Sequence, residues 1–220
     1  MSEFTVLVGN AAGTPLPAGL TQVLSQSDTL RIVDVVRNWA QLLAMVERHH
    51  PDLLVLDRML WRAASGRRLQ RISLPSPAPR IVMFSDLLDA SVVGEAIAYG
   101  VQGCMTSVAS ESQWSNAIQV VLDGDIAMPR KLLASALENS LHRRVDDPTW
   151  PEKLSAEGNE PLTDRERDVI RCVTSGMTNK EIARHLGISD ATVKTHLHHV
   201  FGKLKVGRRM LLVPGSTLAS

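Results

Sequence analysis

The most informative absences in this sequence concern membranes, export and disulfides. Its 220 residues contain no run of about 18 apolar residues, the length that a membrane-spanning helix requires. Its start lacks a basic segment followed by an apolar stretch, so no signal peptide is evident. Cys104 and Cys172 are too few for a disulfide framework and fit a reducing compartment as buried packing residues. These features predict a cytoplasmic protein without membrane contact.

The sequence also lacks the short motifs of common catalytic sites. It has no Gly-rich phosphate loop, no Gly-x-Ser-x-Gly elbow and no Cys-His nucleophile arrangement. A metal site is not favoured either, because zinc sites add Cys or carboxylate ligands at set spacings. Only Cys172 is a candidate ligand near the histidines at 185, 196, 198 and 199. We therefore expect neither an enzyme nor a resident metal.

What the sequence does contain is an uneven distribution of charge. Residues 162–213 hold ten Lys and Arg against five Asp and Glu, a formal charge of +5. Residues 1–161 carry −4, with 14 basic and 18 acidic side chains. This asymmetry indicates a nucleic-acid partner at the basic end, rather than an ordinary helical subdomain with solvated charges.

The basic end has the pattern of two helices joined by a short turn. Thr178 and Glu181 form a capping box, Gly187 tolerates the positive φ that ends a helix, and Ser189 can cap the next helix. The apolar stripes are Ile182, Ala183 and Leu186 in the first helix and Val193, Leu197, Val200 and Leu204 in the second. This is the layout of a helix-turn-helix, which places its second helix in the DNA major groove.

A further helix precedes these two and completes a small three-helix core. Thr163 and Glu166 form its capping box, and Gly176 ends it. Its buried stripe is expected to consist of Val169, Ile170 and Val173. On the second helix of the turn motif, the face opposite the apolar stripe presents Lys194, Thr195 and His198.

Residues 162–206, LTDRERDVIRCVTSGMTNKEIARHLGISDATVKTHLHHVFGKLKV, resemble the DNA-binding domain of LuxR-type regulators. The resemblance implies that the second helix of the turn motif enters the major groove. Lys194, Thr195 and His198 would then approach base edges. The residues that would hold phosphates are Asn179, Lys180, Ser189 and Thr192. Phosphate contacts position such a protein, whereas base contacts specify its site.

In the first half, apolar runs of strand length alternate with helical patterns. The expected strands are Phe4–Val8, Leu30–Val36, Leu53–Leu56, Ile81–Phe84 and Gly103–Thr106. The expected helices are Leu16–Ser25, Trp39–His49, Gly66–Leu74, Asp89–Tyr99 and Glu111–Leu122. The alternation predicts a parallel sheet covered on both faces. We expect a flavodoxin-like, doubly wound α/β domain of five parallel strands, followed by an all-α helix-turn-helix domain.

Asp57 ends the third expected strand and Ser85 ends the fourth, at the edge where doubly wound folds place their sites. PDLLVLD (51–57) resembles the third strand of response-regulator receiver domains, and GVQGCMTS (100–107) resembles the stretch leading into their fifth strand. The resemblance implies that Asp57 accepts a phosphoryl group and that Ser85 would contact it. With the C-terminal resemblance, nearly the whole chain is similar to LuxR/NarL/FixJ-type response regulators.

Several positions depart from the receiver pattern. Receivers end their first strand in an acidic pair that holds Mg²⁺, but Gly9 and Asn10 stand here; they also carry a Lys where this chain has Ser107. A hard cation needs carboxylate oxygens, and phosphoryl transfer depends on cations that neutralise developing charge. Arg58 is the one candidate to replace some of that charge. We therefore expect a degenerate pseudo-receiver, with Mg²⁺ as a cofactor only if the site still functions.

A linker and a tail complete the predicted organisation. Pro129 suits the first turn of a helix over Met128–Leu141, and the polar stretch Arg143–Glu160 indicates a linker. The expected parts are a receiver-like domain (1–125), a linker (126–160), a DNA-binding domain (161–213) and a flexible tail (214–220). Pro214 and Gly215 would end the last helix early, which weakens the expectation of a dimer.

Three functional hypotheses follow from these patterns. The first is a transcriptional regulator that binds double-stranded DNA as a homodimer through a helix-turn-helix and is not controlled by Mg²⁺-dependent phosphorylation. The second is a conventional response regulator, phosphorylated on Asp57 by a sensor kinase. The third is a heterodimerising interaction module that binds DNA weakly.

Overall fold

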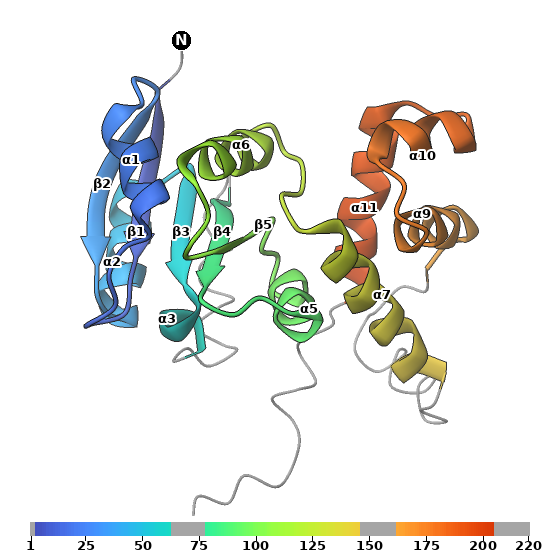
Figure 1. The fold of residues 1–220 in the computed structure, drawn as a ribbon, viewed down its shortest axis with the longest axis horizontal. Coiled ribbons are helices and arrows are strands. Elements are labelled where there is room, and N and C mark those ends of the chain that lie inside the picture. Colours follow the sequence, from blue (N-terminus) through green and yellow to red (C-terminus); the bar gives the residue numbers. More distant parts are fainter. Residues whose placement is uncertain (1–2, 63–77, 146–161, 205–220) are drawn as a thin grey trace, which may run out of the picture. The chain divides into compact units, whose positions relative to one another are not determined.

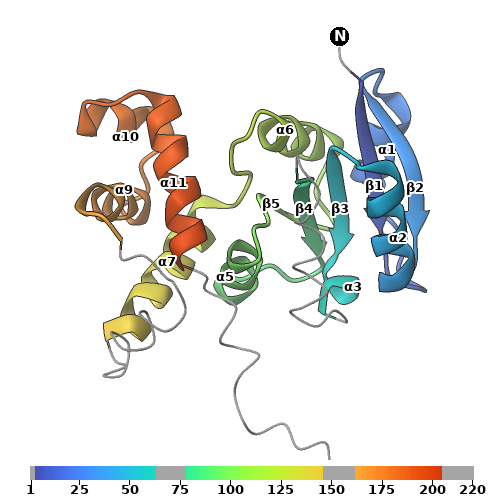
Figure 2. The same cartoon turned by 180° about the vertical axis from the view of Figure 1, so that it is seen from behind.

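The computed structural model describes residues 3–62, 78–145 and 162–204 (Figures 1 and 2). The strands are β1 (Phe4–Gly9), β2 (Leu30–Val36), β3 (Leu53–Asp57), β4 (Arg80–Ser85) and β5 (Gly103–Thr106). The first helices are α1 (Ala18–Gln26), α2 (Trp39–His49), α3 (Arg58–Arg62), α5 (Ala90–Ala98) and α6 (Glu111–Leu122). The later ones are α7 (Arg130–Val145), α9 (Asp164–Thr174), α10 (Asn179–Leu186) and α11 (Asp190–Leu204).

The five strands form one sheet in the order β2-β1-β3-β4-β5, and every neighbouring pair is parallel. This is the flavodoxin-like order. The chain adds β2 on one side of β1 and then adds β3, β4 and β5 on the other side. The predicted doubly wound α/β fold is therefore confirmed. Because all strands run the same way, the residues that end β1, β3, β4 and β5 meet at one edge of the sheet.

Apolar side chains on both faces of the sheet hold this unit together. On one face, Val8, Val55 and Phe84 pack in a core with residues of α1 and α6. Trp114 of α6 is fully buried there and meets Phe84 edge-to-face, with ring centroids 6.1 Å apart. On the other face, Gly9 lies so close to Leu56 of β3 and Leu60 of α3 that a Cβ at this position would collide with their side chains, at 2.7 and 2.9 Å.

Most predicted elements of this half appear with small changes in their ends. Strands β1 and β3 each run one residue further than expected, and β4 extends by one residue at both ends. Helix α3 is not among the helices expected from the sequence. Helix α7 continues to Val145, beyond the predicted end at Leu141. The predicted helix Gly66–Leu74 lies outside the described residues.

The chain divides into two compact units. The first comprises Met1–Leu88 with Val101–Met128, and the second comprises Asp89–Gly100 with Pro129–Ser220. Helix α5 thus groups with α7 and the C-terminal helices rather than with the sheet. The predicted boundaries at 125 and 160 stay predictions. None of the helices in the described ranges is both long and apolar enough to cross a membrane.

Candidate nucleic-acid interface

The helices α9, α10 and α11 begin and end where the local sequence directs them. Thr163 with Glu166 and Thr178 with Glu181 form the two predicted capping boxes, each satisfying backbone amides that a helix start leaves free. Gly187 ends α10 in the left-handed region at φ 65°. The hydroxyl of Ser189 accepts a 3.0 Å hydrogen bond from the amide of Thr192 and so caps α11.

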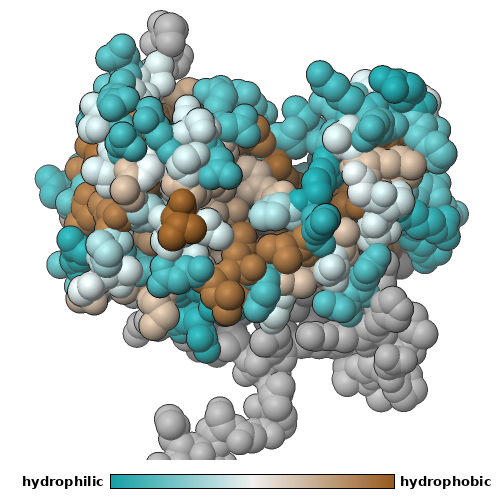
Figure 3. Space-filling model, in the orientation of Figure 1, coloured by the Kyte–Doolittle hydropathy of each residue, from teal (hydrophilic) through white to brown (hydrophobic). Residues whose placement is uncertain are grey.

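Helix α11 has one buried face and one exposed face, as the spacing predicted. Val193, Leu197 and Val200 are buried in the three-helix core. Thr195 and His198 are exposed on the opposite side, and Lys194 beside them is partly exposed. The side chain of Leu204 lies outside the described residues. The three side chains predicted to approach bases therefore share the solvent side of one helix. The surface of α9, α10 and α11 is mostly hydrophilic on the face that Figure 3 shows.

The residues predicted to hold phosphates lie at the starts of two helices. Asn179 and Lys180 are the first two residues of α10, and Ser189 and Thr192 lie at the start of α11, where their hydroxyl oxygens are 2.7 Å apart. Helix N-termini present free amides and a partial positive charge, which suits anions. Oδ1 of Asn179 accepts a 2.7 Å hydrogen bond from the guanidinium of Arg130, the first residue of α7.

A buried ion pair joins α11 to α9. Glu166 is 2% exposed, and its Oε2 lies 3.0 Å from Nζ of Lys203. Burial raises the pKa of Glu166, but hydrogen bonds from Thr163 and Lys203, together with the charge of Lys203, outweigh it and hold the pKa below its ordinary value of 4.5. Arg165 donates to the carbonyl of Leu186 and so ties α9 to the end of α10.

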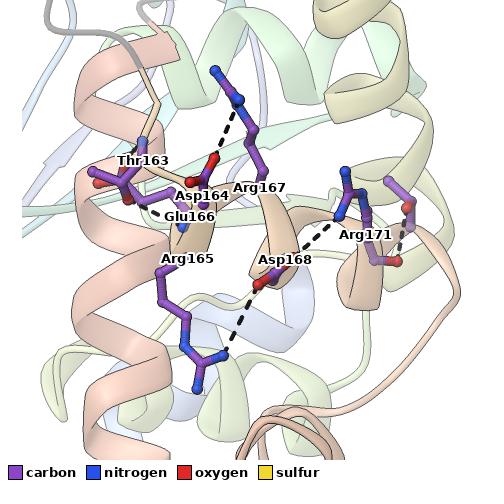
Figure 4. A network of polar contacts seen from close by, with 8 residues as sticks. Thr163, Asp164, Arg165, Glu166, Arg167, Asp168 and Arg171 are labelled. Atoms are coloured by element: carbon purple, nitrogen blue, oxygen red, sulfur yellow. Dashed lines mark hydrogen bonds and ion pairs between the residues drawn. The ribbon is translucent and has the colours of Figure 1, made fainter.

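The exposed side of α9 carries a row of short-range ion pairs, drawn in Figure 4. Arg167 contacts Asp164 at 3.4 Å, and Asp168 is contacted by Arg171 at 3.1 Å and by Arg165 at 3.9 Å. Exposed pairs of this kind contribute little to stability. Their effect is to neutralise the acidic residues of α9 locally.

At the carboxyl edge of the sheet, Asp57 and Asn10 are both buried. Asp57 is 3% exposed; its Oδ2 accepts a 3.2 Å hydrogen bond from the amide of Ala11, and its Oδ1 accepts a 2.8 Å one from the amide of Met59. Asn10 donates through Nδ2 to the carbonyl of Thr14 at 2.6 Å. Among the described residues, its buried Oδ1 has no hydrogen-bond partner.

The remaining predicted residues of this edge point their polar atoms elsewhere. Ser85 donates to the carbonyl of Leu87 at 2.7 Å, and the hydroxyl of Ser107 donates to Asp86. The amide of Ser107 bonds the carbonyl of Ser85 at 3.1 Å, so β4 and β5 are joined here. Mg²⁺ requires several hard oxygens in octahedral geometry. Asp57 and Asn10 supply it with one carboxylate and one neutral amide oxygen, and this pair does not fit that ion.

The same edge exposes apolar side chains. Met59, Leu87 and Val108 are 62%, 67% and 89% exposed, and each stands two residues beyond the end of its strand. Because β3, β4 and β5 are neighbours in the sheet, these side chains follow three adjacent strand ends. Elsewhere, within residues 3–62, 78–145 and 162–204, no group of three His, Cys, Asp or Glu is placed to hold a metal ion.

Comparison with known proteins identifies both halves of the chain. Residues 160–214 match the family model of the bacterial regulatory proteins of the LuxR family. The chain is 32% identical over 160 residues to the glycerol metabolism activator of Pseudomonas putida, covering 72% of this chain and 70% of that protein. It belongs to the LuxR/NarL family of response regulators.

A second relative agrees with this assignment, and a solved structure shows the same fold. The nitrate/nitrite response regulator protein NarL of Escherichia coli (strain K12) is 28% identical over 195 residues, which is 89% of this chain and 87% of that protein. A LuxR-family response regulator from Aurantimonas sp. SI85-9A1 has the same fold, with a TM-score of 0.54 at 17% identity over 64% of this chain and 99% of that one. LuxR/NarL-type regulators are DNA-binding transcriptional regulators, and this chain is one of them.

Sequence reasoning found the faces of this LuxR/NarL-type domain but missed three of its polar links. The pair between Asp190 and Lys194 has the i,i+4 spacing of a helical ion pair and was detectable. The bond from Arg130 to Asn179 and the pair of Glu166 with Lys203 join residues 49 and 37 positions apart. No local sequence pattern predicts contacts between residues so far apart in the chain.

Proposed function

We propose that this LuxR/NarL-type regulator recognises a specific sequence of double-stranded DNA by placing α11 in the major groove. The observation that carries the proposal is the arrangement of α11, with Val193, Leu197 and Val200 buried on one side and Lys194, Thr195 and His198 on the other. The major groove admits one α-helix and displays a distinct pattern of donors and acceptors for each base pair. Lysine donates to the acceptors of guanine, and Thr contacts either a polar edge or a thymine methyl group.

A division of labour between phosphates and bases is part of this proposal. Asn179, Lys180, Ser189 and Thr192 stand at two helix starts and would bind the phosphates that flank the groove. Such contacts set the orientation of α11 on the duplex without reading sequence. The base-reading residues lie further along α11, at positions 194, 195 and 198.

The test is a selection of the full-length protein against a random duplex library, followed by binding measurements over a range of salt concentrations. We expect enrichment of one sequence motif, and an affinity for that motif at least about a thousandfold above that for random duplex. Affinity that is equal for selected and random duplexes at every salt concentration would reject sequence-specific binding.

We propose further that the regulator acts as a homodimer. Helix-turn-helix proteins gain affinity by placing two copies on half-sites one helical turn apart, and a repeated motif in the selected sequences would reflect this geometry. Sedimentation of the protein with the selected duplex distinguishes the outcomes. Two copies per duplex support the homodimer, whereas a monomer without DNA affinity at low salt supports the heterodimerising module instead.

We propose that the receiver-like unit is not switched by Mg²⁺-dependent phosphorylation, and that a protein partner, a ligand or abundance regulates it. In support, both oxygens of Asp57 accept backbone amides, Asn10 supplies one amide oxygen, and Ser85 and Ser107 bond to other groups. The retained carboxylate of Asp57 at the end of β3 favours the alternative of a phosphorylated regulator with a partner kinase. The two readings differ in what they require of Mg²⁺.

Titration with Mg²⁺ and beryllofluoride, followed by Trp fluorescence and sedimentation, separates these alternatives. Trp61 lies four residues after Asp57 and is buried, which makes it a suitable reporter. We expect no saturable response at millimolar Mg²⁺, and we expect Asp57→Ala to leave DNA affinity unchanged. A saturable response that Asp57→Ala abolishes would establish the phosphorylation switch.

A further inference from the structure

Helix α11 carries an acidic residue on the side proposed to meet DNA. Asp190 is its first residue, and Oδ2 of Asp190 lies 3.5 Å from Nζ of Lys194, one helical turn further on. Both side chains are partly exposed, at 40% for Asp190 and 32% for Lys194. The lysine predicted to read a base is therefore held beside a carboxylate.

Helix capping alone does not account for this carboxylate. The amide of Thr192 bonds the hydroxyl of Ser189, and the amide of Val193 bonds the carbonyl of Ser189, so Ser189 caps the helix. Asp190 also benefits from the helix dipole, as would any acid in this first turn. The two roles make different predictions, because a dipole effect concerns folding, whereas a carboxylate near DNA concerns binding.

Near a duplex, a carboxylate in this position opposes binding in general. Sequence-independent affinity comes from cations that neutralise phosphates, and Asp190 cancels the charge of Lys194 over a short distance. A carboxylate becomes favourable in the major groove only where it accepts a hydrogen bond from an exocyclic base amine, above all cytosine N4. Such a bond would also draw Asp190 away from Lys194 and free the ammonium group to donate to a neighbouring guanine.

We propose that Asp190 is a specificity-determining residue, which rests on the DNA-binding function proposed above. At random sequence, Asp190 stays paired with Lys194 and lowers affinity. At the cognate site, Asp190 accepts from a cytosine amine, and Lys194 reads guanine O6 or N7 on an adjacent base pair. Because Asp190 and Lys194 must separate before either one contacts a base, the two contacts form together, and only where the cytosine and the guanine are adjacent.

Asp190→Asn tests this idea, because it removes the charge and keeps the size of the side chain. Wild type and variant are each selected against the random library, and their affinities for selected and random duplexes are measured. We expect Asp190→Asn to bind random duplex more tightly. We also expect a loss of about tenfold in discrimination at the cytosine position, while other positions of the motif persist.

Asp164→Asn is the matched control. Asp164 is likewise the first residue of a helix and pairs with an arginine three residues on, but it belongs to α9 and is almost fully exposed. We expect this variant to select the wild-type motif with wild-type discrimination.

The outcomes distinguish the two proposals from each other. An unchanged motif and unchanged discrimination in Asp190→Asn would overturn the role of Asp190 and leave the proposed function standing. Equal effects of Asp190→Asn and Asp164→Asn would show a general charge effect and would also overturn it. Failure of the wild type to select any motif would overturn the proposed function itself. Thermal unfolding of each variant shows whether a loss of binding reflects a loss of folding.

Discussion

Nζ of Lys203, near the end of α11, lies 3.0 Å from Oε2 of Glu166 in the first turn of α9, and both side chains are mostly buried. Glu166 also accepts the amide of Thr163 at 2.7 Å, so one carboxylate caps α9 and holds α11. The orientation of the helix proposed to enter DNA is thereby fixed at its far end, away from Lys194. Removing one partner of a buried pair is costly, because it leaves the other charge uncompensated.

Glu166→Ala should destabilise the C-terminal helices by about 3 kcal/mol, the scale for breaking a buried ion pair from one side. Denaturant unfolding monitored by helical circular dichroism measures this loss. Glu181→Ala is the control, since Glu181 forms the same capping box on α10 but is exposed; its loss should be smaller. A double change of Glu166 to Gln and Lys203 to Met should recover part of the stability, and no recovery would argue against the pair.

The carboxylate of Glu166 should also make the free energy of unfolding depend on pH. The pKa of Glu166 is lowered in the folded state, so its contribution is fully present above the unfolded value of 4.5 and is lost as pH falls through the folded pKa. The free energy of unfolding should therefore decline below about pH 4.5, and Glu166→Gln should show a shallower decline. Parallel pH profiles for wild type and Glu166→Gln would contradict this assignment.

Lys194→Ala and Lys180→Ala remove the same charge from two different roles. Lys194 is predicted to contact bases, so its loss should weaken binding to the selected duplex more than to random duplex, by about 1–3 kcal/mol. His198→Ala should behave in the same way. Lys180→Ala should weaken binding to both duplexes equally. It should also reduce the slope of log affinity against log salt concentration by about 1. Equal losses on both duplexes for Lys194→Ala would reject its base-reading role.

Arg130→Gln tests the link between α7 and α10. The guanidinium donates to Oδ1 of Asn179 and adds positive charge beside a residue predicted to hold phosphate. We expect weaker binding to selected and random duplexes alike, with a smaller salt slope, as for a phosphate contact. The neighbouring Lys131 is exposed, and Lys131→Gln removes the same charge without touching Asn179. Tighter DNA binding by Arg130→Gln would mean that Arg130 competes with DNA.

Cys104 should resist alkylation in the native protein. Burial raises the pKa of its thiol to about 12, and only the thiolate reacts. Burial, followed by the charge of Asp168, also raises the pKa of Cys172. Mass spectrometry after iodoacetamide treatment near pH 8 should find Cys104 modified only when denaturant is present. Rapid modification of Cys104 in folded protein would contradict the buried position.

The sheet and the helix-turn-helix could be predicted because short-range patterns determine them. Apolar runs such as that of β3 are read directly as strands, and both capping boxes on α9 and α10 fix helix starts through residues three apart. Helix α3 was missed because its five residues are too few to show a period. The extension of α7 was missed because its last turn consists of polar residues that the composition assigns to a linker.

The polar contacts of the candidate site were harder to foresee. Whether Glu166 meets Lys203 depends on how α11 crosses α9, and this follows from packing rather than from any local motif. Likewise, the absence of an acidic pair beside Asp57 could be read from Gly9 and Asn10, but not the bonds that turn Ser85 and Ser107 away. Local sequence patterns predicted which residues lie at the site. The packing of helices and strands determined which partners their side chains contact.

Both oxygens of the Asp57 carboxylate accept hydrogen bonds from main-chain amides. Whether this carboxylate is phosphorylated also determines how long a response of the regulator lasts. An acyl phosphate hydrolyses at its own rate, so a phosphorylated switch contains a built-in period after which it turns off. If Asp57 stays unmodified, as we propose, this regulator has no such period. The duration of its response is then set by how long the protein, or whatever binds it, persists in the cell.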